Sequence, residues 1–207
     1  MGSNDNIIKP PFSEESIQQT IAGVNSGSAN RSRIIWIDGV DTLSDIDVNP
    51  APANIPNADG KKSLEVFKCY HTFGSMSHKS RGSNLLRPAQ VEASNVWVLT
   101  HSNILILQLL ARNFQGGISR IVLSSLANIG TGPDIKPSVV RVKEFETCYV
   151  EYVDTEIAEG FTLWGFSFVA VTMTYVDIKQ VSDGGQNIPA GKRVFKYDYS
   201  KGSGALS

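Results

Sequence analysis

The residues that could carry chemistry in this sequence are few, and their spacing does not complete a familiar site. Cys69, His71 and His78 offer three ligands for a metal ion, whereas a closed structural zinc site needs four. No CxxC or HExxH pattern accompanies them. The sequence therefore predicts no metal site.

Two groups of acidic residues imitate parts of known sites. The stretch 45–49 (DIDVN) resembles the start of a calcium loop, but Pro50 stands where that loop requires glycine. Glu144 and Glu146 lie two residues apart, and paired carboxylates can do acid–base chemistry. On an exposed strand face such pairs more often meet partners across strands. We interpret both groups as structural.

Motifs for nucleophilic or nucleotide chemistry are absent from the sequence, which has no GxSxG, P-loop or GxGxxG pattern. Trp36, Trp97 and Trp164 come without a basic stripe, so we interpret them as core or interface residues rather than a platform for bases. By elimination the chain is predicted to be a non-enzyme without catalytic residues or a cofactor. An enzyme on a β scaffold is the weakest of three hypotheses.

Length and charge narrow the class of protein. The chain has 207 residues, enough for one domain with a substantial core, and a formal net charge of −1. This balance argues against a nucleic-acid binder and against a polybasic membrane surface. No apolar run is long enough for a membrane helix. Residues 1–12 lack the features of a cleavable signal peptide, so any export is expected to use another route.

The two cysteines, Cys69 and Cys148, each fall in a predicted strand. A single pair cannot form the disulfide framework of a small secreted domain. We interpret both as buried small hydrophobic residues, with one disulfide as the alternative.

The longest β signal, residues 166–181, organises the rest of the chain. Its residues alternate with period two, and no Pro or Gly interrupts them. Both alternating sets are partly apolar, whereas a strand with one face in water shows one polar set. We expect a core on one side and a helix or another subunit on the other. The packing residues are Phe166, Phe168, Val169, Val171, Met173 and Tyr175.

Shorter elements surround this strand. A single mostly buried helix is predicted at 101–114, where the apolar face is wide. About eight strands with one inserted helix suit a closed β-barrel or a curved sandwich. The other main strands are predicted at 33–38, 64–70, 91–99, 118–124, 138–153 and 193–199.

The remaining segments are expected to lie outside the barrel. Residues 1–31 form a polar extension, flexible or bound to a partner, with one short helix at 13–19 capped by Ser13. The Pro-rich stretch 49–62 is predicted to be a surface loop. Residues 74–88 (GSMSHKSRGSNLLRP) form a long loop that is either functional or disordered. The tail from 201 is expected to be loose.

Several phrases, taken in order, resemble the Hcp family, the tube-forming proteins of type VI secretion systems. RIIWIDGV at 33–40 is similar to the family's opening I-x-I-D-G-I phrase, and 74–88 to its extended loop. VKEFETCYV at 142–150 resembles the strand L-x-x-V-x-V-x-x-V, and 166–175 followed by 193–199 resembles the closing strands. Order and spacing carry the resemblance, which covers roughly residues 34–201.

The resemblance implies a flattened closed barrel of antiparallel strands, formed by residues 32–207, with one flanking helix at about 101–114. It implies rings of six copies that stack into a tube inside a contractile sheath, with spike proteins and small effectors as partners. It also implies a protein of the bacterial cytoplasm that is secreted without a cleavable signal, with no nucleic acid and no membrane insertion. The expected ring-stacking loop residues are Ser75, His78, Lys79, Arg81 and Arg87. The alternative is a monomeric barrel that binds a small apolar ligand.

Overall fold

The computed structural model of the chain describes residues 9–27, 32–42, 44–49, 55, 57–76, 90–102, 105–128, 136–180 and 187–206. Its elements are two helices, α1 (Glu14–Asn25) and α2 (Leu105–Phe114), and the strands β1 (Arg33–Ile37), β2 (Leu64–Tyr70), β3 (Phe73–Met76), β4 (Gln90–Ala93), β5 (Val96–His101), β6 (Ile118–Asn128), β7 (Pro137–Ala158), β8 (Phe161–Gln180), β9 (Asn187–Asp198) and β10 (Ser203–Leu206).

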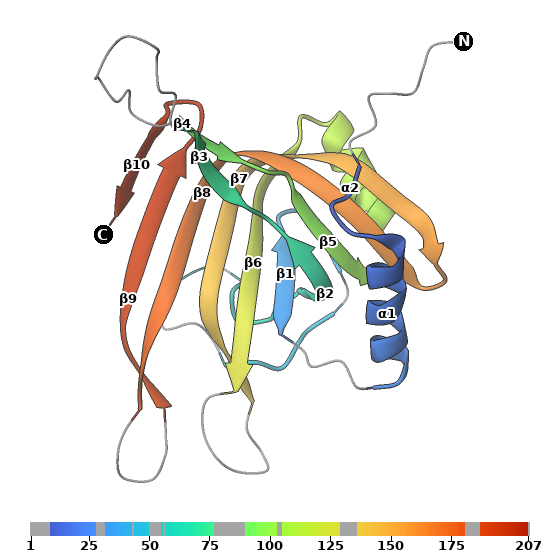
Figure 1. Ribbon diagram of the computed structural model, residues 1–207, viewed down its shortest axis with the longest axis horizontal. Helices are drawn as coiled ribbons and strands as arrows, with labels where there is room; N and C mark the ends of the chain where they lie inside the picture. Colours follow the sequence, from blue (N-terminus) through green and yellow to red (C-terminus); the bar gives the residue numbers. More distant parts are fainter. Residues whose placement is uncertain are drawn as a thin grey trace.

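Six antiparallel strands close into a barrel in the order β8, β5, β2, β1, β6 and β7, because β7 pairs back onto β8 (Figure 1). The prediction of a mainly β, closed antiparallel barrel is confirmed. The short β3–β4 pair forms a separate two-stranded sheet.

Strand β8 belongs to two parts of the molecule at once. One of its edges pairs with β7, and the other edge is divided. Residues 161–166 pair with β5 and close the barrel, whereas residues 170–180 pair with β9 and extend the sheet beyond it. Strand β10 then adds to β9 (Figure 1). A 20-residue strand is therefore long enough to serve the barrel and the extension in turn.

Large side chains fill the interior of the barrel. Phe145, Trp164 and Phe166 have no exposed surface, and the indole N–H of Trp164 donates to the buried Thr100 hydroxyl at 3.3 Å. Gly165 lets β8 approach β5, since a Cβ there would lie 2.9 Å from the Trp97 ring. All three tryptophans are buried, in agreement with their interpretation as core or interface residues.

The described residues on either side of the Pro-rich stretch pack against one outer face of the barrel, whereas Pro50, Pro52 and Pro56 lie outside the described residues. Ile46, Val48 and Ala58 are buried against Trp36 and other apolar residues of β1, β6 and β7. A parallel bridge between Asn49 and Ser138 pins the segment to the start of β7. This part of the chain therefore supplies a cover for the barrel wall.

Helix α1 covers a second outer face. Ser13 caps it, because the backbone N–H of Ser16 donates to the Ser13 hydroxyl at 3.3 Å, as the sequence predicts. Ile17 and Ile21 are buried against Leu99 and Leu163 of the barrel wall. The helix runs to Asn25 rather than ending at 19, because apolar contacts continue past the polar positions that suggested a linker.

Several boundaries differ from the predictions. The strand expected at 91–99 is divided into β4 and β5, and the expected loose tail contains β10. The helix expected at 101–114 begins at Leu105 because His101 still pairs with Phe161 in the sheet. There are thus two helices and ten strands in the described part of the chain.

Candidate assembly surfaces

Helix α2 presents an apolar face to solvent. Leu107 is 71 % exposed, Leu110 40 % and Phe114 91 %, and positions 107, 110 and 114 share one side of a helix. Leu109, on the other side, has no exposed surface and packs into the barrel core. The prediction that this helix is mostly buried is wrong, because a wide apolar face does not show which side meets the barrel.

Polar contacts fix α2 in this orientation. Asn113 exchanges two 3.0 Å hydrogen bonds with the backbone of Val150 in β7. Arg112 donates to the carbonyl of Gly39 at 2.9 Å, and the Gln108 side chain accepts from the Asp41 N–H at 2.9 Å. The helix is therefore held at three points, and its exposed apolar face is a fixed feature of the subunit.

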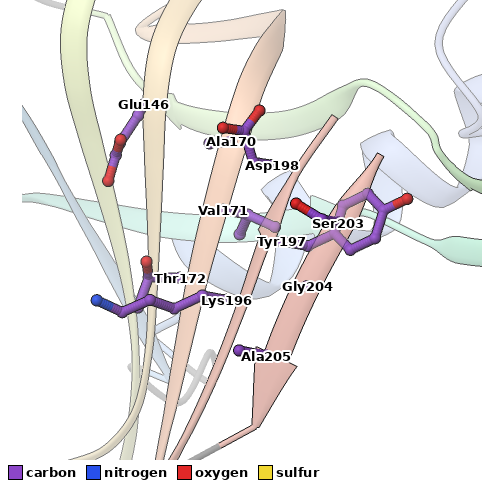
Figure 2. Close-up of a pocket in the computed structure, with 10 residues that line it drawn as sticks. All are labelled: Glu146, Ala170, Val171, Thr172, Lys196, Tyr197, Asp198, Ser203, Gly204 and Ala205. Carbon is purple, nitrogen blue, oxygen red and sulfur yellow. The ribbon is translucent and has the colours of Figure 1, made fainter. Parts of the chain in front are cut away.

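The sheet extension carries a hollow of about 330 Å³ on the face of β7, β8, β9 and β10. Figure 2 shows side chains from all four strands around it, with Glu146 on β7 and Lys196 on β9. Strand β10 lies close against β9, since a Cβ on Gly204 would meet the Tyr197 ring at 2.7 Å. Leu206 at the end of β10 is 76 % exposed. Among the described strands, β10 is the last of the sheet and pairs only with β9, so it is an edge strand.

A groove of about 320 Å³ lies between α1 and the β7–β8 hairpin. Apolar side chains and three carboxylates line it together. The Tyr152 hydroxyl donates to the Asp154 carboxylate at 3.2 Å, and the Glu156 N–H donates to the same carboxylate at 2.9 Å. Burial, and then the charge of Asp154, raise the pKa of Tyr152. The phenol is therefore a fixed donor in the groove wall.

One buried cluster contains a histidine. The His71 ring packs edge-on against Phe73, Phe145 and Phe168, with centroid distances of 4.3, 5.3 and 5.4 Å. The Lys143 amine lies 3.2 Å from its Nδ1, and in the described part of the chain Nε2 is buried without a hydrogen-bond partner. Burial, and then the charge of Lys143, lower the pKa of His71 to about 3. The ring is therefore neutral in the folded protein.

Glu144 and Asp47, two of the acidic residues considered above, have structural partners. Glu144 forms a 3.2 Å ion pair with Arg120 on the neighbouring strand, and Asp47 pairs with Lys136 at 2.9 Å. Both cysteines are free, Cys148 being fully buried and Cys69 partly so. Burial raises the pKa of the Cys148 thiol to about 12. Among the described residues, no group of three or more His, Cys, Asp or Glu side chains is placed to hold a metal ion.

The predicted packing residues of β8 fall in different environments. Phe166 and Val171 are buried in the barrel core, and Phe168 and Met173 are half-buried against it. Val169 is half-buried. Tyr175 is 39 % exposed and lies under the Arg141 guanidinium at 4.5 Å.

Most of the predicted loop residues are outside the described part of the chain. Ser75 lies in β3, whereas His78, Lys79, Arg81 and Arg87 belong to the stretch 77–89 that is not described. The structure therefore brings none of these side chains to a defined place, and their role stays a prediction.

The fold of this chain matches solved structures of a type six secretion system protein and of Hcp1. One solved structure, described as a type six secretion system protein, matches with a TM-score of 0.61 at 16 % identity, covering 85 % of this chain and 100 % of that one. Hcp1 from Salmonella typhimurium matches with a TM-score of 0.52 at 19 % identity, covering 84 % and 98 % of the two chains. No family model matches the sequence, and no curated protein does. This chain therefore has an Hcp-like fold, as the sequence predicts.

Sequence reasoning missed the surfaces that the fold creates. The groove beside α1 joins Phe12 to Leu163, which are far apart in the sequence, and only the docking of the helix shows that they meet. The paired acidic residues of the β7–β8 hairpin, Asp154 and Glu156, are visible in the sequence but not their position beside α1. No helix in the described part of the chain is both long and apolar enough to cross a membrane.

Proposed function

We propose that this chain is a structural tube component of a type VI secretion system, in which six copies form a ring and rings stack into an inner tube. The observation that carries the proposal is the Hcp-like fold, which spans 100 % and 98 % of the two neighbours described above. A contractile sheath would drive the tube, and spike proteins and small effectors would be its partners. In this role the chain is secreted without catalysing a reaction.

The exposed apolar face of α2 supports self-association. Contiguous exposed side chains such as Leu107 and Phe114 are unusual on a monomer and are typical of an interface. Strand β10, with Leu206, lies on the opposite side of the molecule from α2 (Figure 1). Two different surfaces on opposite sides permit a head-to-tail contact, which closes into a ring when the rotation between copies allows it.

The charge of the chain fits the same role. A formal net charge of −1 lets many copies pack without strong mutual repulsion. The loop residues Ser75, His78, Lys79, Arg81 and Arg87 are proposed to contribute to ring stacking. Deleting residues 75–83 is then expected to leave the rings intact and to weaken their stacking.

The alternative, a monomeric barrel that holds a small apolar ligand, is less well supported. Phe145, Trp164 and Phe166 occupy the interior and are fully buried. A ligand-binding barrel instead leaves an apolar cavity of several hundred Å³ for its ligand. Three hollows lined by described residues lie on the sheet extension, beside α1 and near β1.

Negative-stain microscopy of the purified protein at high micromolar concentration tests the proposal. Rings with six-fold symmetry, alone or in stacks, are the expected result. A field of monomers at this concentration, confirmed by size-exclusion chromatography, would contradict it and would favour the binding-module alternative. A ligand that copurifies with the monomer would decide for that alternative.

A further inference from the structure

We propose that the groove between α1 and the β7–β8 hairpin binds the basic segment 77–89 of a second copy of this chain. The inference rests on the proposed function for one point, that assembly brings copies into contact. The proposal gives the predicted stacking segment a binding site on a neighbouring copy, and α1 forms part of that site.

The groove has an apolar floor and an acidic rim. Phe12 and Ile17 from the α1 region and Leu163 from β8 supply apolar surface. The remaining lining residues are Pro10, Glu14, Gln18, Tyr152, Asp154, Glu156 and Ile157. This hollow of about 320 Å³ can hold a few side chains of an extended segment.

The carboxylates of the rim are available to a cationic partner. In the described part of the chain, no Lys or Arg lines the groove, and none forms an ion pair with Glu14, Asp154 or Glu156. Asp154 accepts two hydrogen bonds from its own hairpin, and a carboxylate has about four acceptor positions. Its orientation is therefore fixed while acceptor capacity remains for an incoming Arg or Lys.

The segment 77–89 (SHKSRGSNLLRPA) matches both properties of the groove. It contains Lys79, Arg81 and Arg87 and no acidic residue, so its charge is opposite to that of the rim. Leu85 and Leu86 are adjacent and offer apolar side chains for the floor. Complementary charge steers association and sets its register, and burial of the leucines adds apolar contact.

The arrangement of the strands favours binding between copies. Segment 77–89 connects β3 to β4, and in Figure 1 the joined ends of these strands point away from α1 and from the β7–β8 turn. The strand ends that flank the segment lie on one side of the subunit and the groove lies on the other, so binding between copies would form a head-to-tail pair. Repetition of such a pair generates rings or stacks.

Peptide binding tests the inference without requiring rings. The receptor is the full-length chain carrying Lys79→Ser, Arg81→Ser and Arg87→Ser, so that its own segment does not compete for the groove. The probe is a synthetic peptide of residues 77–89, measured by isothermal titration calorimetry at low salt. We expect binding that weakens with added salt. No detectable binding would overturn the inference.

Charge reversal of the groove is the second part of the binding experiment. Asp154→Lys with Glu156→Lys is expected to weaken peptide binding by at least about ten-fold. Glu159→Lys is the matched control, since Glu159 is exposed on the same hairpin but does not line the groove, and it should change binding by less than about two-fold. If the double variant and the Glu159→Lys variant weakened peptide binding equally, the attraction would be non-specific and the inference would be overturned. Equal binding of a scrambled peptide would overturn it in the same way.

The same changes separate this inference from the proposed function. If the wild type forms no rings but the peptide binds as expected, the tube proposal fails and the groove assignment stands. If rings and tubes form and the peptide does not bind, only the groove assignment fails. In a chain that assembles, Asp154→Lys should weaken stacking, and Arg81→Glu in the same chain should restore it. Folding of each variant is checked by thermal unfolding, with Asp154→Asn as a milder variant.

Discussion

Replacing His71 by Phe is expected to remove much of the acid sensitivity of this fold. Three phenyl rings surround the imidazole, and the amine of Lys143 lies against its Nδ1. Burial, followed by the charge of Lys143, lowers the pKa of His71 from 6.5 to about 3. In the folded protein the ring therefore stays neutral at pH values at which the unfolded chain protonates it.

The sign and size of the effect follow from the two pKa values. Because the folded pKa of His71 is depressed, its contribution to stability is complete above pH 6.5 and is lost as the pH falls from 6.5 towards 3. Between pH 7.5 and pH 4.5 this linkage reaches at most about 2.7 kcal/mol. Solvent access to the half-buried ring reduces the expected loss to roughly 1.5–2.5 kcal/mol.

Urea unfolding at pH 7.5 and pH 4.5 measures this loss. Relative to the wild type, His71→Phe is expected to lose about 1.5–2.5 kcal/mol less between the two pH values. Phe73→Leu is the control, because it removes a ring contact but keeps the histidine. It should lower the unfolding free energy at both pH values and preserve the difference. A His71→Phe protein as acid-sensitive as the wild type would refute the reasoning.

Other substitutions test the packing and the assembly. Phe114→Ser, at a 91 % exposed position, is expected to prevent ring formation while changing the unfolding free energy by less than about 0.5 kcal/mol; sedimentation velocity that still shows rings would remove α2 from the contact. Gly165→Ala should cost about 1–3 kcal/mol in urea unfolding, since its Cβ would lie 2.9 Å from the Trp97 ring; wild-type stability would mean that the ring moves freely. Ile17→Asp, at a 2 % exposed position, should release α1 and expose it to limited proteolysis, and an uncut helix would contradict this. Val171→Asp, at a 1 % exposed core position, should abolish folding, and a soluble assembled variant would place that side chain outside the core.

The barrel was predictable because the residue types of its central strand, β8, indicate burial on both faces. Both alternating sets of residues 166–181 are partly apolar, which predicts cover on two sides. Phe166 and Val171 face the barrel core, whereas Leu163 lies under α1. The sequence could not predict that α1 covers this strand. The region around α1 is polar, and its few apolar residues do not indicate which part of the barrel they contact.

Short elements escaped prediction because pairing, rather than residue type, creates them. Strand β10 reads SGAL and contains no β-branched residue, yet it pairs with β9 along its whole length. Gly204 permits this close approach to Tyr197. The residue types at 203–206 do not favour a strand, and only the pairing with the preceding strand β9 creates one.

The candidate surfaces were predictable only in part. The apolar residues of 105–114 were recognised, but a wide apolar face fits a buried helix and an interface helix equally well. Leu109 meets the core and Phe114 meets solvent, a division that depends on the contacts of Arg112 and Asn113 with other elements. The acidic groove forms only where α1 contacts the β7–β8 hairpin. No local sequence pattern predicts this contact.

The mass of the purified protein in solution tests the central claim most directly. One chain has a mass of 22.5 kDa, so a ring of six copies has six times that mass, about 135 kDa. Multi-angle light scattering across a range of concentrations is expected to give this mass or multiples of it from stacked rings. A constant mass of 22.5 kDa up to high micromolar concentration would contradict the account.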